Sequence, residues 1–150
     1  MKIFIPSKSR HKEQITLSFM PDDIKANTTL VIDASEEEDY AKVHDNLLIV
    51  PEEIKGISGV RQYIWDNSDD PRIVILDDDL RFYVRKSPTD WHLRYLEPEE
   101  YHGVFGLLDE WMDQGYGHCG VSAREGNNRV KDLSTENTRY IRTLAYDLDI

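Results

Sequence analysis

An apolar, β-branched run ends abruptly in three consecutive carboxylates between residues 72 and 79. Residues 72–76 read Arg-Ile-Val-Ile-Leu, and Asp77, Asp78 and Asp79 follow directly. A run of this length and composition is typical of a strand that is buried on both faces. Such strands belong mostly to parallel sheets in α/β proteins, whose ligands bind outside the carboxyl ends of the strands. The pattern therefore predicts an α/β fold with the three carboxylates at a ligand-binding edge.

The acidic triplet has two possible roles. Adjacent carboxylates repel one another, so they favour a positively charged neighbour, and a divalent cation with oxygen ligands meets this requirement. In a chain with 29 acidic and 18 basic residues, an acidic triplet also occurs as a solvated turn. The uninterrupted strand in front of the triplet favours metal or nucleotide chemistry over the solvated turn.

Strands and helices alternate through the first half of the chain. The predicted strands are Lys2–Pro6, Thr28–Asp33, Leu47–Val50 and Arg72–Leu76. The predicted helices are residues 11–20, a segment capped by Ser35, and residues 59–67. This alternation predicts a βαβαβαβ unit with a mostly parallel sheet and right-handed crossovers. Neither a Gly-x-Gly-x-x-Gly motif nor a P-loop follows the first strand, which argues against dinucleotide and P-loop sites.

The second half of the chain predicts a mixture of helix and strand. A helix opens at Glu97-Pro98 and ends at Gly115, and its apolar residues repeat at intervals of three and four. This stripe is assigned to the core and consists of Tyr101, Val104, Phe105, Leu108, Trp111 and Met112. Further strands are expected at residues 82–84 and 117–123, and Ser134 is expected to cap a segment that runs through Leu144. Residues 144–150 alternate like a strand without a later partner, an edge that would suit a homodimer contact or a missing continuation.

Composition limits the class of protein. A chain of 150 residues, 39% apolar and 31% charged, suits one soluble globular domain. It lacks an apolar run of about 20 residues, the length of a membrane span, and residues 1–6 become polar too soon for a signal peptide. The single cysteine, Cys119, excludes an internal disulfide and is expected in the core, so a cytoplasmic location is predicted.

Charge is unevenly distributed along the chain. The net charge of −11 argues against wide contact with nucleic-acid phosphates. Basic residues nevertheless gather after the acidic triplet and in the last thirty residues, where they would either hold a diphosphate or form ordinary surface. They are Arg81, Arg85, Lys86 and Arg94, and then Arg124, Arg129, Lys131, Arg139 and Arg142.

The carboxyl ends of the predicted parallel strands would meet at one edge. Ser7 follows the first strand, Asp33 ends the second, and Asp77 follows the fourth. A carboxylate after the second strand, here Asp33, is well placed to accept hydrogen bonds from a ribose or a base. The alternative role for Asp33 is an N-cap or turn residue before the next helix.

Several motifs occur in the order found in one enzyme family. Residues 5–10 (Ile-Pro-Ser-Lys-Ser-Arg), 59–64 (Gly-Val-Arg-Gln-Tyr-Ile) and 75–80 (Ile-Leu-Asp-Asp-Asp-Leu) resemble A-type (GT-A) nucleotide-sugar glycosyltransferases. Within that class the chain resembles the phage glycosyltransferases associated with DNA-base oxygenases of the TET/JBP kind. Residues 120–129 also look like the loop that follows the metal motif in those proteins.

This resemblance implies a function and a set of site residues. It implies a Rossmann-like GT-A sheet and a metal-dependent transferase, in which Asp77 and Asp79 bind Mg²⁺ or Mn²⁺ at the diphosphate of the nucleotide-sugar donor. The metal would offset charge on the departing diphosphate, and arginines would add fork-like contacts. The acceptor would be a hydroxymethylated pyrimidine in phage DNA, which places the protein in the host cytoplasm. The implied nucleotide-sugar-binding residues are Pro6, Ser7, Arg10, Asp33, Arg61, Asp77, Asp78 and Arg124.

Other interpretations stay open at this stage. GT-A enzymes usually exceed 150 residues, so residues 1–150 are expected to form one glycosyltransferase-like domain, truncated at the C-terminus and inactive in transfer by itself. The net charge also leaves a small-molecule or protein acceptor possible. There are two alternative functions. One is a sugar nucleotidyltransferase, which normally has a glycine-rich loop with a basic residue after the first strand; residues 7–10 supply basic residues but no glycines. The other is a noncatalytic binding or assembly module. The catalytic base is not identified, and its candidates are Asp90, Asp109, Asp113, Glu125, Asp132 and Glu136.

Overall fold

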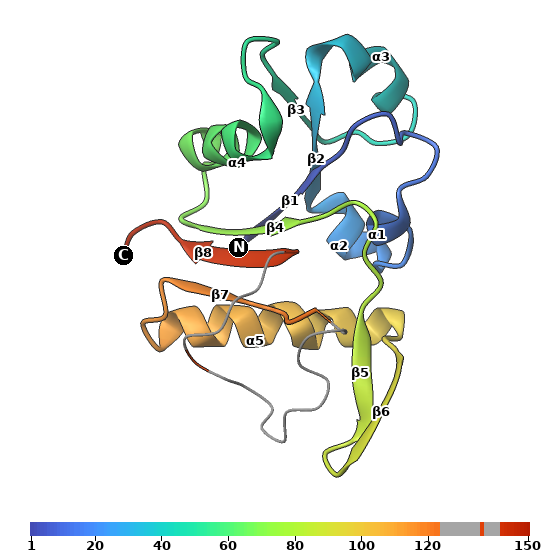
Figure 1. The fold of residues 1–150 in the computed structure, drawn as a ribbon, viewed down its shortest axis with the longest axis vertical. Coiled ribbons are helices and arrows are strands. Elements are labelled where there is room, and N and C mark those ends of the chain that lie inside the picture. The colour runs from blue at the N-terminus through green and yellow to red at the C-terminus, as the bar shows by residue number, and fades with distance from the viewer. Residues whose placement is uncertain (124–135, 137–141) are drawn as a thin grey trace.

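A six-stranded sheet in the order β3-β2-β1-β4-β8-β7 forms the centre of the molecule (Figure 1). The computed structural model describes residues 1–123, 136 and 142–150, with Trp91 described by its backbone alone. The first four strands run parallel, while β8 is antiparallel to both β4 and β7. The strands are β1 (Lys2–Pro6), β2 (Thr28–Asp33), β3 (Leu47–Val50), β4 (Arg72–Leu76), β7 (His118–Gly120) and β8 (Thr143–Asp147). The α/β class, the mostly parallel sheet and the bounds of the first four strands are as predicted.

The strand order reverses between β1 and β4. From β1 the chain moves to β2 and then β3, and it returns to place β4 on the other side of β1. Different elements cover the two faces of the sheet. Ile5 and Leu76 pack toward the helices α1 (Ile15–Ser18), α2 (Asp22–Ala26) and α5 (Tyr101–Asp113), whereas Phe4 and Ile75 pack toward α4 (Gly56–Asn67). In doubly wound sheets ligands bind at such a reversal, outside the carboxyl ends of the strands. We call the gap between the carboxyl ends of β1 and β4 the switch point.

The helices differ in part from the prediction. They are α1 (Ile15–Ser18), α2 (Asp22–Ala26), η1 (Ala34–Glu36), α3 (Glu37–Tyr40), α4 (Gly56–Asn67), η2 (Pro98–Glu100) and α5 (Tyr101–Asp113). The predicted helix 11–20 is wrong in extent: only α1 is helical there, and the Gln14 side chain just before it donates to Ser7 and to the Arg10 carbonyl. Pro21 caps the unpredicted helix α2. The predicted Ser35 cap is also wrong, since the Asp33 side chain caps η1 by accepting from the Ser35 amide.

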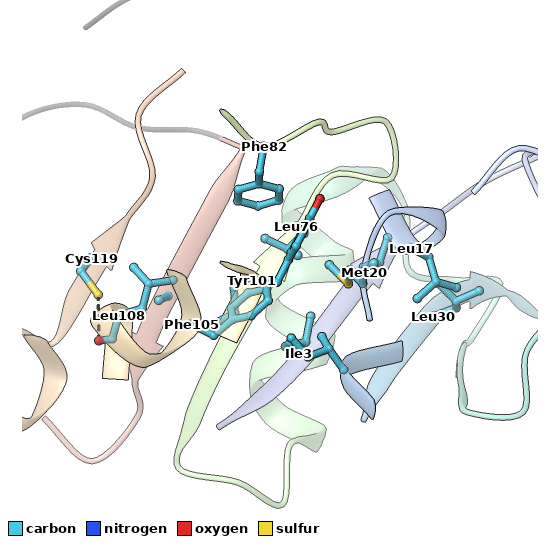
Figure 2. Packing of buried hydrophobic residues seen from close by; sticks show 14 of the residues in the cluster. Ile3, Leu17, Met20, Leu30, Leu76, Phe82, Tyr101, Phe105, Leu108 and Cys119 are labelled. Atoms are coloured by element: carbon cyan, nitrogen blue, oxygen red, sulfur yellow. Dashed lines mark hydrogen bonds between the residues drawn. The ribbon is translucent and has the colours of Figure 1, made fainter. Parts of the chain in front are cut away.

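Helix α5 buries the predicted apolar stripe against the sheet. Tyr101, Phe105, Leu108 and Met112 are buried, and Val104 and Trp111 are partly buried against the same cluster. Figure 2 shows the stripe facing Ile3 and Leu76, with the Cys119 Sγ–H directed at the Leu108 carbonyl 3.6 Å away. Burial raises the pKa of Cys119 to about 11, so this thiol serves packing rather than nucleophilic chemistry, as predicted.

The C-terminal half corrects two strand predictions. β8 lies inside the sheet between β4 and β7, so the expectation of an unpaired terminal edge is wrong, and the homodimer contact that it suggested loses its basis. Strand 117–123 shortens to β7, and strand 82–84 becomes β5 (Tyr83–Ser87), which pairs with the unpredicted β6 (Asp90–Tyr95) in a hairpin outside the main sheet (Figure 1). Most of the segment predicted from Ser134 to Leu144 lies outside the described residues. Within the described part, no helix is both long and apolar enough to cross a membrane.

Candidate functional site

Side chains from distant parts of the sequence meet at the switch point. Ser7 follows β1, and Asp77, Asp78 and Asp79 follow β4. Because β1 and β4 are neighbouring parallel strands, their carboxyl ends lie side by side. The structure therefore places the acidic triplet where an α/β sheet binds ligands, as the sequence predicted.

The Ser7 hydroxyl joins the loop after β1 to the acidic triplet. It donates to Asp78 Oδ2 at 2.7 Å and accepts from Gln14 Nε2 at 2.7 Å. Tyr40 Oη lies 2.8 Å from the same oxygen, and the only Ser7 proton already points at Asp78, so the Tyr40 hydroxyl donates here. Tyr40 in turn accepts from the Arg10 amide at 3.1 Å. The buried Ser7 thus fixes the position of Asp78.

Two arginines supply the positive neighbours that the triplet requires. Arg10 Nη1 lies 2.8 Å from Asp78 Oδ1 and 3.3 Å from Asp79 Oδ2, and the Asp78 charge raises the pKa of Arg10. From the opposite face of the sheet, Arg61 Nη2 on α4 lies 3.8 Å from Asp77 Oδ1. Arg10 and Arg61 therefore hold the triplet from two sides, and both were predicted site residues.

The main chain of the triplet is held by Thr16 of α1. Thr16 Oγ1 donates to the Asp77 carbonyl at 2.6 Å and accepts from the Leu80 amide at 2.7 Å. The Asp77 amide donates to the Arg142 carbonyl at 3.1 Å, which ties the triplet to the start of β8. These hydrogen bonds fix the main chain of residues 77–80 at both ends, so the side chains of the triplet are held in one arrangement.

The Asp77 carboxylate carries an electrostatic cost when it is ionised. Burial raises its pKa, and Asp79 adds to this effect, while Arg61 and Arg142 act in the opposite direction. A raised pKa means that ionised Asp77 destabilises the fold once the pH exceeds that pKa. A cation bound at this carboxylate would relieve the cost.

The loops after β1 and β2 are joined by Ser9 and Glu36. Ser9 has a φ of 58°, a left-handed conformation that is uncommon for serine. Its amide and hydroxyl donate to Glu36 Oε1 at 2.8 and 3.1 Å. Within the described residues, Glu36 Oε2 and Gln14 Oε1 are buried without a hydrogen-bond partner. Buried acceptors without partners are costly, so a ligand that donates hydrogen bonds would be stabilised beside them.

The remaining predicted site residues and the C-terminal basic residues have separate positions. Asp33 lies at the same edge but acts locally, accepting from the Ser35 amide and hydroxyl at 3.1 and 2.8 Å, bonds that lower the pKa of its carboxyl. Pro6 is the last residue of β1. Arg142 lies near enough for its charge to lower the pKa of Asp77. Outside the described residues lie Arg124, Arg129, Lys131 and Arg139.

Most candidates for the catalytic base lie away from the switch point. Asp109 and Asp113 both pair with Arg72, at the opposite end of β4. Asp90 lies on the hairpin and pairs with His92. Glu136 accepts from the Tyr116 hydroxyl, and Glu125 and Asp132 lie outside the described residues. Conversely, sequence reasoning missed Gln14, Thr16 and Tyr40, because nothing in the local pattern links them to residues so far along the chain.

The exposed carboxylates of the triplet suit a hard divalent cation that also contacts phosphate. Among the described residues, no group of three His, Cys, Asp or Glu side chains is arranged to hold a metal alone. Asp77 and Asp79 keep 36% and 46% of their side-chain surface exposed, compared with 12% for Asp78. Mg²⁺ is commonly held by one or two carboxylates together with substrate phosphates. Asp77 and Asp79 fit that arrangement, whereas the Asp78 carboxylate is already occupied by Ser7 and Arg10.

Comparison with known proteins indicates the family of the chain. The sequence profile of the family described as TET-associated glycosyltransferase matches residues 1–147. A β-glucosyl-HMC-α-glucosyl-transferase from Enterobacteria phage T2 is 24% identical over an alignment of 156 positions that covers 93% of this chain and 55% of that protein. The chain therefore spans about half the length of this curated relative. Because the profile covers nearly the whole chain, the protein belongs to the TET-associated glycosyltransferase family.

Proposed function

We propose that this chain is the donor-binding part of a metal-dependent glycosyltransferase of the GT-A kind that modifies DNA. The observation that supports this most directly is the contact between Ser7, Asp78 and Arg10 at the switch point, which leaves Asp77 and Asp79 more exposed beside it. The acceptor would be a hydroxymethylated pyrimidine, in line with the phage T2 relative, whose name specifies β-glucosyl-HMC.

The diphosphate of a nucleotide sugar would lie over the acidic triplet. Asp77 and Asp79 would hold Mg²⁺ or Mn²⁺, which when bound offsets the charge that develops on the departing diphosphate. Arg61 would turn toward phosphate oxygens, for which a guanidinium offers several donors. Ser7 would act as a positioning residue, since its hydroxyl keeps Asp78 and Arg10 in place beneath the donor.

The nucleoside would occupy the side of β1 and β2. Asp33, Gln14 and Glu36 offer acceptor oxygens there, and two of these oxygens are buried without a partner in the described part of the chain. Ribose hydroxyls and base N–H groups are donors that would satisfy them. Pro6 would contribute apolar contact at the end of β1, and Arg124 is retained as an expected diphosphate contact.

The two alternative functions are less compatible with the site. A sugar nucleotidyltransferase needs free backbone amides after the first strand to bind phosphate, but here the Ser9 amide is used by Glu36 and the Arg10 amide by Tyr40. An assembly module would leave the triplet solvated, but Asp78 is paired with both Arg10 and Ser7. We therefore retain glycosyl transfer.

The function is tested by calorimetric titration with a panel of nucleotide sugars, with and without Mn²⁺. We expect one nucleotide sugar to bind, and to bind more tightly when Mn²⁺ is present. Mass spectrometry of hydroxymethylated DNA incubated with the same donor should then show little or no added sugar. The reason is that a transferase also needs a group that deprotonates the acceptor, and the candidates within the described residues, Asp90, Asp109, Asp113 and Glu136, lie in contacts elsewhere. If no nucleotide sugar bound, the proposal would be contradicted. If the chain transferred sugar to DNA at an enzyme-like rate, it would be more than the donor-binding part that we propose.

The Arg61→Met variant isolates the contact with the donor. Arg61 lies at the triplet and a charged hydrogen bond contributes about 1.5–3 kcal/mol, so nucleotide-sugar affinity should fall by about 10- to 150-fold. Thermal unfolding without ligand should change little. Lys42→Met, in the exposed turn that follows α3, is the control and should bind like the unaltered chain. Unchanged binding together with a large loss of stability would assign Arg61 to the fold instead.

A further inference from the structure

Four side chains form a continuous stack beside the acidic triplet. The Arg81 guanidinium lies 4.2 Å from the ring centroid of Phe19 and 5.1 Å from that of Tyr95. The rings of Tyr95 and Tyr83 follow, with centroids 4.7 Å apart and planes inclined by 34°. We call Phe19, Arg81, Tyr83 and Tyr95 the stack. Its members come from the end of α1, the segment after the triplet, and both strands of the hairpin.

The stack is exposed although the protein has a large core. Phe19 keeps 38% and Tyr95 52% of its surface exposed, and Arg81 is exposed between them. Aromatic surface of this size contributes little to folding where it stays in water, and contiguous exposed apolar surface usually marks a binding site. The arrangement suits a flat ligand with a π-face, because aromatic rings and guanidinium planes both stack on such ligands.

The stack is attached to the candidate site. Arg81 follows Asp79 by two residues, and Phe19 follows helix α1, whose Thr16 holds the Asp77 carbonyl and the Leu80 amide. Arg61 approaches the triplet from α4, on the other face of the sheet. A ligand on the stack would therefore lie next to the carboxylates, on the side opposite Arg61.

Charge on the hairpin indicates the class of ligand. Residues 81–94 contain four basic residues and one acidic residue, in a chain whose net charge is −11. Arg94 is bound by Glu100, with two contacts of 2.6 Å, while Arg81 and Lys86 are exposed. The hairpin projects away from the main sheet (Figure 1). Its charge would attract a phosphate backbone.

We propose that the stack binds an unstacked pyrimidine base of the DNA acceptor, with the adjoining phosphates along the β5–β6 hairpin. This rests on the proposed function and names the place where its acceptor is held. An enzyme that acts on a base cannot reach it inside a duplex and takes it out of the helix. Stacking on aromatic side chains then holds the base with little sequence preference. The stack would present that base to the donor over the triplet.

Tyr95→Ser and Arg81→Gln test the stack by fluorescence anisotropy with a short labelled single-stranded oligonucleotide at low ionic strength. Each should weaken DNA binding by about 5- to 150-fold, the effect of removing a base-stacking contact. Tyr116→Ser removes an exposed tyrosine that precedes β7, at the opposite end of the sheet, and should bind DNA like the unaltered chain. Circular dichroism and thermal unfolding identify any variant that fails to fold, and Arg81→Gln still tests the stack if Tyr95→Ser is such a variant.

Nucleotide-sugar titration of the same variants separates this inference from the proposed function. Reduced DNA affinity with unchanged donor affinity supports the stack as the acceptor site. Unchanged DNA affinity in folded Tyr95→Ser and Arg81→Gln overturns it, and so does reduced donor affinity, which would assign the stack to the donor base. If the unaltered chain binds donor but no DNA, the stack inference fails and the donor proposal stands. If it binds DNA through the stack but no nucleotide sugar, the proposed function fails and the base-binding site stands.

Discussion

Replacing Phe105 with alanine should lower the free energy of unfolding by about 3–5 kcal/mol, the usual cost of a large-to-small change in a core. Phe105 lies on the buried face of α5 and packs in the cluster with Ile3, Tyr101 and Leu108 (Figure 2). Its removal leaves a cavity beneath the sheet that neighbouring side chains fill only in part. A loss of this size is a large share of the 5–15 kcal/mol that stabilises a typical domain.

Urea unfolding followed by circular dichroism measures this effect. Leu107→Ala is the matched control, because Leu107 lies on the same helix but is exposed. The control should shift the free energy of unfolding by no more than about 0.5 kcal/mol, as surface substitutions usually do. If Phe105→Ala proved as mild as Leu107→Ala, the apolar stripe of α5 would be a surface for a partner rather than part of the core.

Asp79→Asn should abolish the joint stabilisation by metal and nucleotide. In the unaltered chain, Mn²⁺ and the nucleotide sugar together at about 100 times the dissociation constant should add about 2.7 kcal/mol by mass action. For a chain of this size that corresponds to a rise in Tm of about 5–10 °C. The variant loses one of the two exposed carboxylates assigned to the cation, so the rise should disappear, while Tm without ligand changes little.

Differential scanning fluorimetry with metal alone, nucleotide sugar alone and both together measures this coupling. Asp69→Asn is the control, since Asp69 precedes β4 at the far end of the sheet and pairs only with Lys2 among the described ion pairs. The control should keep the full rise in Tm. The assignment of Asp79 would have to be abandoned if its variant showed the same rise as the unaltered chain.

Features that depend on local pattern were predictable from the sequence. The parallel strands β1 to β4 were predicted with their observed bounds, because strands covered on both faces are continuous apolar runs that end at polar residues. Helix α5 was predictable because one face of a helix recurs every three to four residues. The acidic triplet could be predicted as a site because its position after a buried strand is itself a local property.

Features that depend on pairing between distant segments required the folded chain. β8 was predicted as an unpaired edge but lies inside the sheet, since no local pattern specifies which strand pairs with which. Residues 11–20 were predicted as one helix, but only Ile15–Ser18 is helical, and the Gln14 side chain before it donates to Ser7 and to the Arg10 carbonyl. Tertiary hydrogen bonds there outweigh a helical propensity that amounts to less than 1 kcal/mol per residue.

The candidate site shows the same division. The residue types and their positions could be predicted from the sequence, since Ser7 and Arg10 follow one predicted strand and Asp78 follows another. Their contact was not, because Ser7 and Asp78 are 71 positions apart and meet only where β4 returns to the side of β1. Tyr40, which completes the network around Ser7, comes from a third segment that no motif marked. Composition and spacing thus specified the chemical groups and the strands that carry them, while the order of strands in the sheet brought those groups within hydrogen-bonding distance.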